Sequence, residues 1–120
     1  MAEHNDLGKK GEELAVAYLR EKGYRILERN YYFQKAEIDI LALQDDVLVV
    51  VEVKLRSTNY FGTPQEFVNA KKIQLLVAAA NHYIEVKNLD VEVRFDIIAI
   101  LQQYNQKTSI EHIEDAFLHF

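Results

Sequence analysis

Three charged residues lie in a stretch that is otherwise typical of buried sheet. Residues 38–54 read IDILALQDDVLVVVEVK, with Asp39, Glu52 and Lys54 placed among isoleucine, leucine and valine. Two carboxylates held close together can share a divalent cation, because Mg²⁺ prefers oxygen ligands and one or two carboxylates can hold it. A lysine beside them could stabilise negative charge that develops on a reacting group. The stretch is therefore a candidate site for metal-assisted chemistry, if the fold brings these residues together.

The same stretch predicts a β-hairpin with Asp45 and Asp46 as its two-residue turn. In this register, one face of the hairpin contains only apolar facing pairs: Ile38 with Val53, Ile40 with Val51, and Ala42 with Val49. A slip of one residue would turn one strand over and break this face, so burial selects the register.

The other face of the predicted hairpin is apolar near the turn and charged at its far end. Here Asp39 is expected opposite Glu52, and Glu37 opposite Lys54. Like charges that face each other destabilise a sheet, and partial burial would raise the pKa of one carboxyl group. A divalent cation would remove the conflict. The alternative is that the charges lie in solvent at the end of the sheet, with Lys54 in a salt bridge to Glu37.

A third acid belongs to the first expected helix, GKKGEELAVAYLREKGY. Glu12 lies at the edge of its apolar stripe, whereas Glu13 points away from it. Gly8 and Gly11 have no side chain near that edge, so the helix could approach the sheet and bring Glu12 over the charged end of the hairpin. The alternative is an acid of the first turn, favoured by the helix dipole.

The remaining elements place these residues in an α/β fold. Gly23 is expected to end the first helix, and Thr63, Pro64 and Glu66 are expected to begin a long second one. Strands are expected at 25–33, 36–43, 47–55 and 91–103, and the closing IEHIEDAFLHF as a short strand or helix. The order α-β-β-β-α-β predicts a mixed central sheet flanked by helices.

Composition limits the class of protein. A chain of 120 residues predicts a single domain, 1–120, and 49% hydrophobic with 28% charged residues is typical of a globular protein. Cysteine is absent, which excludes disulfides and thiolate metal sites and fits a reducing, cytoplasmic location. The longest apolar runs are too short to span a membrane, so no membrane partner is expected.

Charge distribution bears on nucleic-acid binding. The net charge of −5 argues against a general nucleic-acid binder. Residues 54–72 nevertheless hold four basic residues against one acid, Glu66; these are Lys54, Arg56, Lys71 and Lys72. Either they form a phosphate-binding patch, or they are a solvated surface.

Several motifs together resemble a known family. The arrangement Asp39, then Glu52-Val53-Lys54, is that of the PD-(D/E)xK nucleases, with Ile38 where the motif has proline. The matching pieces, in order, are GKKGEELA, AEIDILA, VEVKLR, FGTP, Lys71, RFDIIAI and IEHIEDAF. The chain resembles the YraN-like family (UPF0102) of uncharacterised, predicted endonucleases, which are similar to archaeal Holliday-junction resolvases.

The resemblance implies a restriction-endonuclease-like three-layer fold and a catalytic core of Asp39, Glu52 and Lys54, with Glu12 as a fourth member. Mg²⁺ or Mn²⁺ would be held by the carboxylates and the carbonyl of Val53. The implied partner is nucleic acid, DNA rather than RNA and branched DNA in particular. Arg56, Lys71 and Lys72 would contact phosphates, and a homodimer would let two sites face two strands.

Other functions remain open at this point. The same fold could bind nucleic acid without cutting it, or serve as a protein-interaction module. Gln74, where the family often has a basic residue, removes one phosphate contact. Asp96 is explained by a partner such as Arg94 or by a helix terminus, and His112 is expected to be an ordinary surface or interface histidine.

Overall fold

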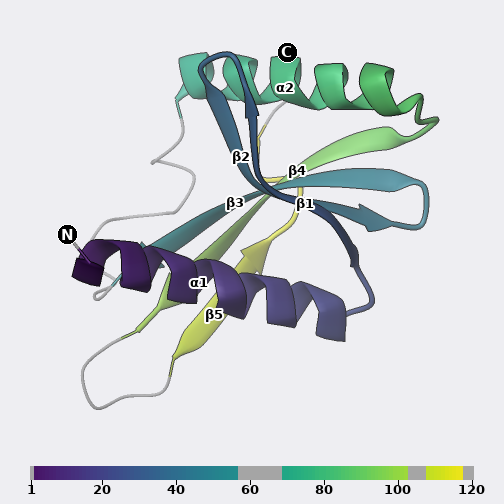
Figure 1. Cartoon of the computed structure of the whole chain (residues 1–120). Helices are drawn as coiled ribbons and strands as arrows, with labels where there is room; N and C mark the ends of the chain where they lie inside the picture. Colours follow the sequence, from purple (N-terminus) through teal and green to yellow (C-terminus); the bar gives the residue numbers. More distant parts are fainter. Residues whose placement is uncertain (1, 57–68, 103–107, 118–120) are drawn as a thin grey trace.

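The computed structural model describes residues 2–56, 69–102 and 108–117, of which residues 2–9 and 56 are described by their backbone alone (Figure 1). Within these residues, two helices and five strands follow one another: α1 (Ala2–Glu21), β1 (Arg25–Phe33), β2 (Ala36–Gln44), β3 (Val47–Arg56), α2 (Ala70–Lys87), β4 (Glu92–Leu101) and β5 (Ser109–Ile113). The segment that begins IEHI, expected as a strand or a helix, is therefore a strand.

The strands form one mixed sheet in the order β1-β2-β3-β4-β5. Only β3 and β4 pair in parallel, and the other neighbours are antiparallel. A parallel pair needs a crossover connection, and α2 belongs to that connection. The predicted mixed sheet is confirmed.

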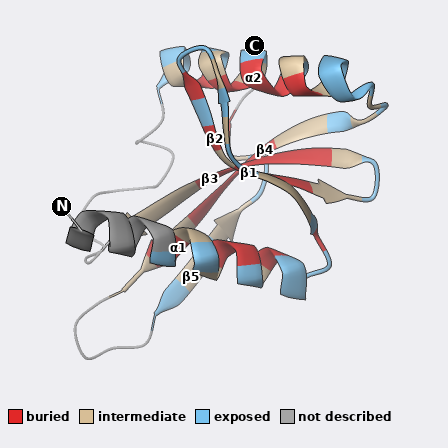
Figure 2. Ribbon diagram, viewed as in Figure 1, coloured by how far each residue is buried: buried red, intermediate tan, exposed pale blue. Residues whose placement is uncertain are grey.

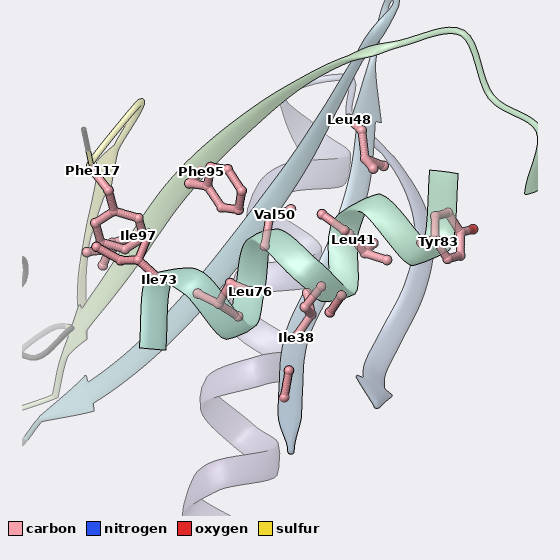
Figure 3. Packing of buried hydrophobic residues seen from close by; sticks show 13 residues of the cluster. Ile38, Leu41, Leu48, Val50, Ile73, Leu76, Tyr83, Phe95, Ile97 and Phe117 are labelled. Carbon is pink, nitrogen blue, oxygen red and sulfur yellow. The ribbon is translucent and has the colours of Figure 1, made fainter. Parts of the chain in front are cut away.

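The two helices cover opposite faces of the sheet, which makes three layers (Figure 1). Buried residues lie on the side of each helix that faces the sheet (Figure 2). The core under α2 includes Leu41, Val50, Leu76 and Phe95 (Figure 3), and the core under α1 includes Leu19. The restriction-endonuclease-like three-layer arrangement predicted from the sequence is confirmed.

Each helix has a defined boundary. After α1, Gly23 has a φ of 92°, a left-handed conformation that glycine adopts without strain, so the predicted stop is confirmed. Helix α2 begins at Ala70, where the Asn69 side chain accepts a hydrogen bond from the amide of Lys72. The cap expected at Thr63 lies outside the described residues.

The hairpin register is the predicted one near the turn. Pairing runs from Gln44 with Val47 to Ile40 with Val51, and Asp45 in the turn has a φ of 54°. Members of the two faces separate into the two cores: Ile40, Ala42, Val49 and Val51 under α1, and Leu41, Leu48 and Val50 under α2.

Beyond Ile40 the strand departs from the prediction. Ile38 packs in the core under α2 rather than on the same face as Ile40, so its expected place opposite Val53 is wrong. On the neighbouring strand β1, the pairs on either side of Asn30 are regular, but Asn30 itself has a φ of 53°. The irregular backbone of β1 accompanies a change of face in β2, and Asp39 lies at that change.

Candidate functional site

The carboxylate of Asp39 lies where β2 and β3 stop pairing. Its Oδ2 accepts a hydrogen bond of 2.8 Å from the backbone amide of Val53. The regular pairs end at Ile40 and Val51, so Asp39 and Glu52 are not a ladder pair as expected. Asp39 instead reaches toward β3 between the two strands, and this brings its carboxylate to the segment that holds Glu52.

Glu52 is the buried acid of the site, with only 4% of its surface exposed. Its Oε2 lies 3.3 Å from the Nζ of Lys54 and also forms an ion pair and hydrogen bond with the Nζ of Lys72. Its Oε1 is buried and has no hydrogen-bond partner among the described residues. A buried polar atom without a partner is costly, typically about 1–3 kcal/mol and more for a charged group. One carboxylate oxygen is thus available for a further ligand.

The two acids act on each other electrostatically. Burial and the negative charge of Glu52 raise the pKa of Asp39 to about 7, although the amide of Val53 opposes the shift. Both effects penalise the ionised form of Asp39. A cation between the carboxylates would reverse that penalty, so the pair has the electrostatic character of a metal site.

Lys54 belongs to the acid pair rather than to Glu37. The predicted salt bridge between Lys54 and Glu37 is wrong: the Oε2 of Glu37 accepts a hydrogen bond of 3.0 Å from the hydroxyl of Tyr32. Lys54 is 17% exposed and pairs with Glu52. Its ammonium group therefore lies beside the candidate metal ligands, where it can act on a reacting group.

Glu12 is held by two residues of β1. Its Oε1 accepts hydrogen bonds from the Nε of Arg29, at 3.3 Å, and from the side-chain amide of Asn30, at 2.8 Å. Among the charges that raise the pKa of Asp39, that of Glu12 has the smallest effect. No group of three acidic or histidine side chains suited to a metal ion occurs in the part of the chain that the structure describes. The structure brings together Asp39, Glu52 and Lys54, while the Glu12 carboxylate is bound by Arg29 and Asn30 of β1.

The donors that are present fit Mg²⁺ or Mn²⁺. Mg²⁺ keeps several waters and is commonly held by one or two carboxylates together with substrate phosphates. Asp39 and the free oxygen of Glu52 meet this need. The backbone of Val53 follows Glu52 directly, and its amide already bonds Asp39.

A pocket of about 410 Å³ opens over the acid pair and is lined at its rim by the start of α2. Lys35, Lys71 and Lys72 contribute positive charge to its lining. The first turn of α2 has no acidic residue, so the positive end of the helix dipole adds to this charge. The pocket therefore has two buried or partly buried acids, Asp39 and Glu52, beneath three lysines and one exposed acid, Glu37. The lysines outnumber the acid near the opening, which suits a metal ion below and a phosphate above.

Two of the three expected phosphate-binding residues reach this pocket. Lys71 is exposed at the rim, whereas Lys72 extends inward to Glu52. Partial burial lowers the pKa of Lys72, but the hydrogen bond and charge of Glu52 outweigh it, so the pKa lies above its ordinary value. The side chain of Arg56 lies outside those described. Lys35, which the sequence did not single out, precedes the acids in the turn before β2.

A second polar cluster lies on the other face of the sheet, under α1. Asp96 is fully buried and accepts hydrogen bonds of 2.9 Å from Arg94, 2.7 Å from His112 and 3.0 Å from the amide of Asp115. The predicted partnership with Arg94 is confirmed. The side chain of His112 is only 4% exposed and also contacts the hydroxyl of Tyr18, so of the two expected positions, surface or interface, the surface one is wrong. This cluster is satisfied internally and stabilises the fold.

Known proteins resemble this chain over the residues that form the site. The model of the uncharacterised protein family UPF0102 matches residues 11–100, which include the whole hairpin and the start of α2. The chain belongs to the UPF0102 family. A UPF0102 protein of Christiangramia forsetii is 63% identical over the full length of both chains.

More distant UPF0102 relatives are also aligned along nearly their whole length. A protein of Flavobacterium psychrophilum is 59% identical over the full length of both chains, and one of Phocaeicola vulgatus is 47% identical over 98% of this chain and 96% of its own. The predicted family is confirmed. Neither described helix of this UPF0102 chain has the length and apolar character needed to cross a bilayer.

Proposed function

We propose that this UPF0102 protein is a metal-dependent endonuclease that hydrolyses phosphodiester bonds in nucleic acid. The observation that supports this most directly is the carboxylate of Glu52, which is buried with one oxygen unpartnered among the described residues. Beside it, burial and the charge of Glu52 raise the pKa of Asp39 and so disfavour its ionised form. Such a pair gains from a divalent cation, and Mg²⁺ or Mn²⁺ is the proposed cofactor.

The surrounding residues have roles that follow from their positions. A bound Mg²⁺ or Mn²⁺ would polarise the phosphate and lower the pKa of a bound water. Lys54, next to Glu52, would orient the attacking water or neutralise charge that develops on the phosphate. Lys71 and Lys35, at the pocket, would contact neighbouring phosphates. The proposed role of Glu12 is electrostatic, since its negative charge helps to raise the pKa of Asp39.

The finer parts of the proposal rest on the family resemblance and on composition. DNA is proposed rather than RNA, with branched DNA as the first substrate to test, and a homodimer would present two sites to two strands. The cysteine-free sequence fits a reducing compartment, and we place the protein in the cytoplasm.

A second candidate function is nucleic-acid binding without cleavage. The observation that favours it is the contact between Lys72 and Glu52, since an ammonium group already neutralises the carboxylate that a metal would need. The net charge of −5 is also unfavourable for strong binding to a polyanion. Measuring binding and cleavage separately distinguishes the two functions.

The test is a cleavage assay with labelled junction, flap, duplex and single-stranded DNA, with Mg²⁺ or Mn²⁺ and with EDTA as the metal-free control. Glu52→Gln removes the charge of a ligand and Lys54→Met removes the ammonium group, each with little change in shape. We expect metal-dependent cleavage by the natural protein and its loss in both variants. Glu85→Gln changes an exposed acid on α2 far along the helix and should leave cleavage unchanged. Cleavage that survives Glu52→Gln and Lys54→Met would overturn the proposal.

A further inference from the structure

Lys72 holds one of the two oxygens of Glu52 that could bind a metal ion. The backbone amide of Lys72 donates a hydrogen bond to the Asn69 cap in the first turn of α2. Its side chain extends from there to the buried Oε2 of Glu52. The lysine side chain is 37% exposed, whereas the glutamate side chain is 5% exposed. The contact therefore runs from the pocket rim to its floor, through the space above the acid pair.

Two acidic groups and two ammonium groups lie close together in the site. Asp39 and Glu52 contribute two acidic groups, and Lys54 and Lys72 contribute two ammonium groups. A divalent cation added to the pair would repel both ammonium groups, because like charges at such short range oppose one another. A metal ion at the Oε1 of Glu52 would bind against this repulsion, and it would bind more tightly once one lysine has moved away from Oε2.

Geometry distinguishes the two lysines. Lys54 lies on the same strand as Glu52, two residues away, and is 17% exposed. Lys72 comes from the facing helix, is about twice as exposed, and borders the pocket beside Lys71. A small rotation of its long side chain would carry the ammonium group from the carboxylate toward the opening, where a phosphate would lie.

We propose that Lys72 is a built-in counter-cation, which a divalent metal displaces and which then binds a phosphodiester of the substrate. This inference rests on the proposed function and adds a form of regulation to it. Metal and nucleic acid would each bind weakly alone, because each must overcome the contact between Lys72 and Glu52. Together they would bind more tightly, since the lysine released by one is used by the other.

The test is calorimetric titration of Mn²⁺ into the protein, alone and saturated with a phosphorothioate oligonucleotide that resists cleavage. Lys72→Met removes the charge, Lys72→Arg keeps it, and Lys87→Met is the matched control at an exposed lysine in the last turn of the same helix. For the natural protein we expect the oligonucleotide to raise Mn²⁺ affinity about tenfold, within the range of ordinary coupling. Lys72→Met should bind Mn²⁺ alone about tenfold more tightly and lose the coupling. Lys72→Arg and Lys87→Met should resemble the natural protein.

The outcomes separate this inference from the proposed function. If the natural protein binds Mn²⁺, Asp39→Asn abolishes binding, and Lys72→Met leaves the affinity unchanged or lower, the metal site stands and the role of Lys72 is overturned. If Mn²⁺ binds to none of the variants, the metal site is absent and both proposals fall. Thermal unfolding of each variant without metal verifies that the titrated proteins are folded.

Discussion

Replacing Asp39 with asparagine should stabilise the metal-free protein at neutral and alkaline pH. The pKa of Asp39 is raised from 3.8 to about 7 by burial and by Glu52. Between these values the folded protein holds a proton that the unfolded chain has released, so stability falls as the pH rises. Above the folded pKa the full penalty is present, and below the unfolded pKa it disappears.

The size of the effect follows from the same values. Each pH unit between about 3.8 and about 7 lowers the free energy of unfolding by about 1.4 kcal/mol. The whole interval therefore lowers it by at most about 4 kcal/mol. Asparagine cannot ionise, and its carbonyl oxygen can still accept the hydrogen bond from Val53. We therefore expect Asp39→Asn to raise the free energy of unfolding by about 2–4 kcal/mol at about pH 8 and to change it little at about pH 4.

The assay is urea unfolding followed by circular dichroism in EDTA, across this pH range, for the natural protein, Asp39→Asn and the exposed control Asp90→Asn. Mn²⁺ at about 100 times its dissociation constant should then stabilise the natural protein by about 2.7 kcal/mol and Asp39→Asn far less. A difference between Asp39→Asn and the natural protein that does not grow with pH would refute the reasoning, because it would mean that neither burial nor Glu52 raises the pKa of Asp39.

Three further changes probe the scaffold by urea unfolding. Asp96 has a pKa below its ordinary value, because hydrogen bonds from His112 and Arg94 outweigh the effect of burial. Its contribution is present above the unfolded pKa and lost on acidification, so Asp96→Asn should cost about 3–5 kcal/mol near neutral pH and less in acid; a cost that grows in acid would contradict this. A Cβ at Gly11 would lie 3.3 Å from the Cβ of Leu55, so Gly11→Leu should destabilise by about 1–3 kcal/mol, whereas an unchanged midpoint would mean that α1 has room to move. Leu76→Ala should cost about 2–5 kcal/mol, and a cost below about 1 kcal/mol would mean that the core under α2 closes around the change.

The hairpin was predictable because its information is local. Alternating apolar residues select the register from Gln44 with Val47 to Ile40 with Val51, and the structure has it. The same reasoning failed at Ile38, because the change of face there accompanies the irregular backbone at Asn30 on the neighbouring strand. A pattern within two strands does not report what a third strand does to them.

In the site, the contacts within the hairpin were predictable and those made by other elements were not. Asp39, Glu52 and Lys54 meet because one hairpin holds them, whereas the contact of Lys72 with Glu52 depends on how α2 docks. Helical periodicity put Glu12 on the correct edge of α1, but Arg29 and Asn30 on β1 hold its carboxylate. His112 was misplaced for a similar reason, since its burial follows only once β5 pairs with β4.

The origin of these residues along the chain has a consequence for folding. The acids belong to adjacent strands joined by a short turn, and such local pairings form quickly, whereas Lys72 arrives with a helix later in the sequence. A nascent hairpin thus carries two acids balanced by Lys54 alone. Packing of α2 then removes the apolar surface of Leu41 and Val50 from water and delivers the missing positive charge in the same step. Electrostatics and the hydrophobic effect consequently favour one order of assembly, with the helix closing over a preformed pair of strands.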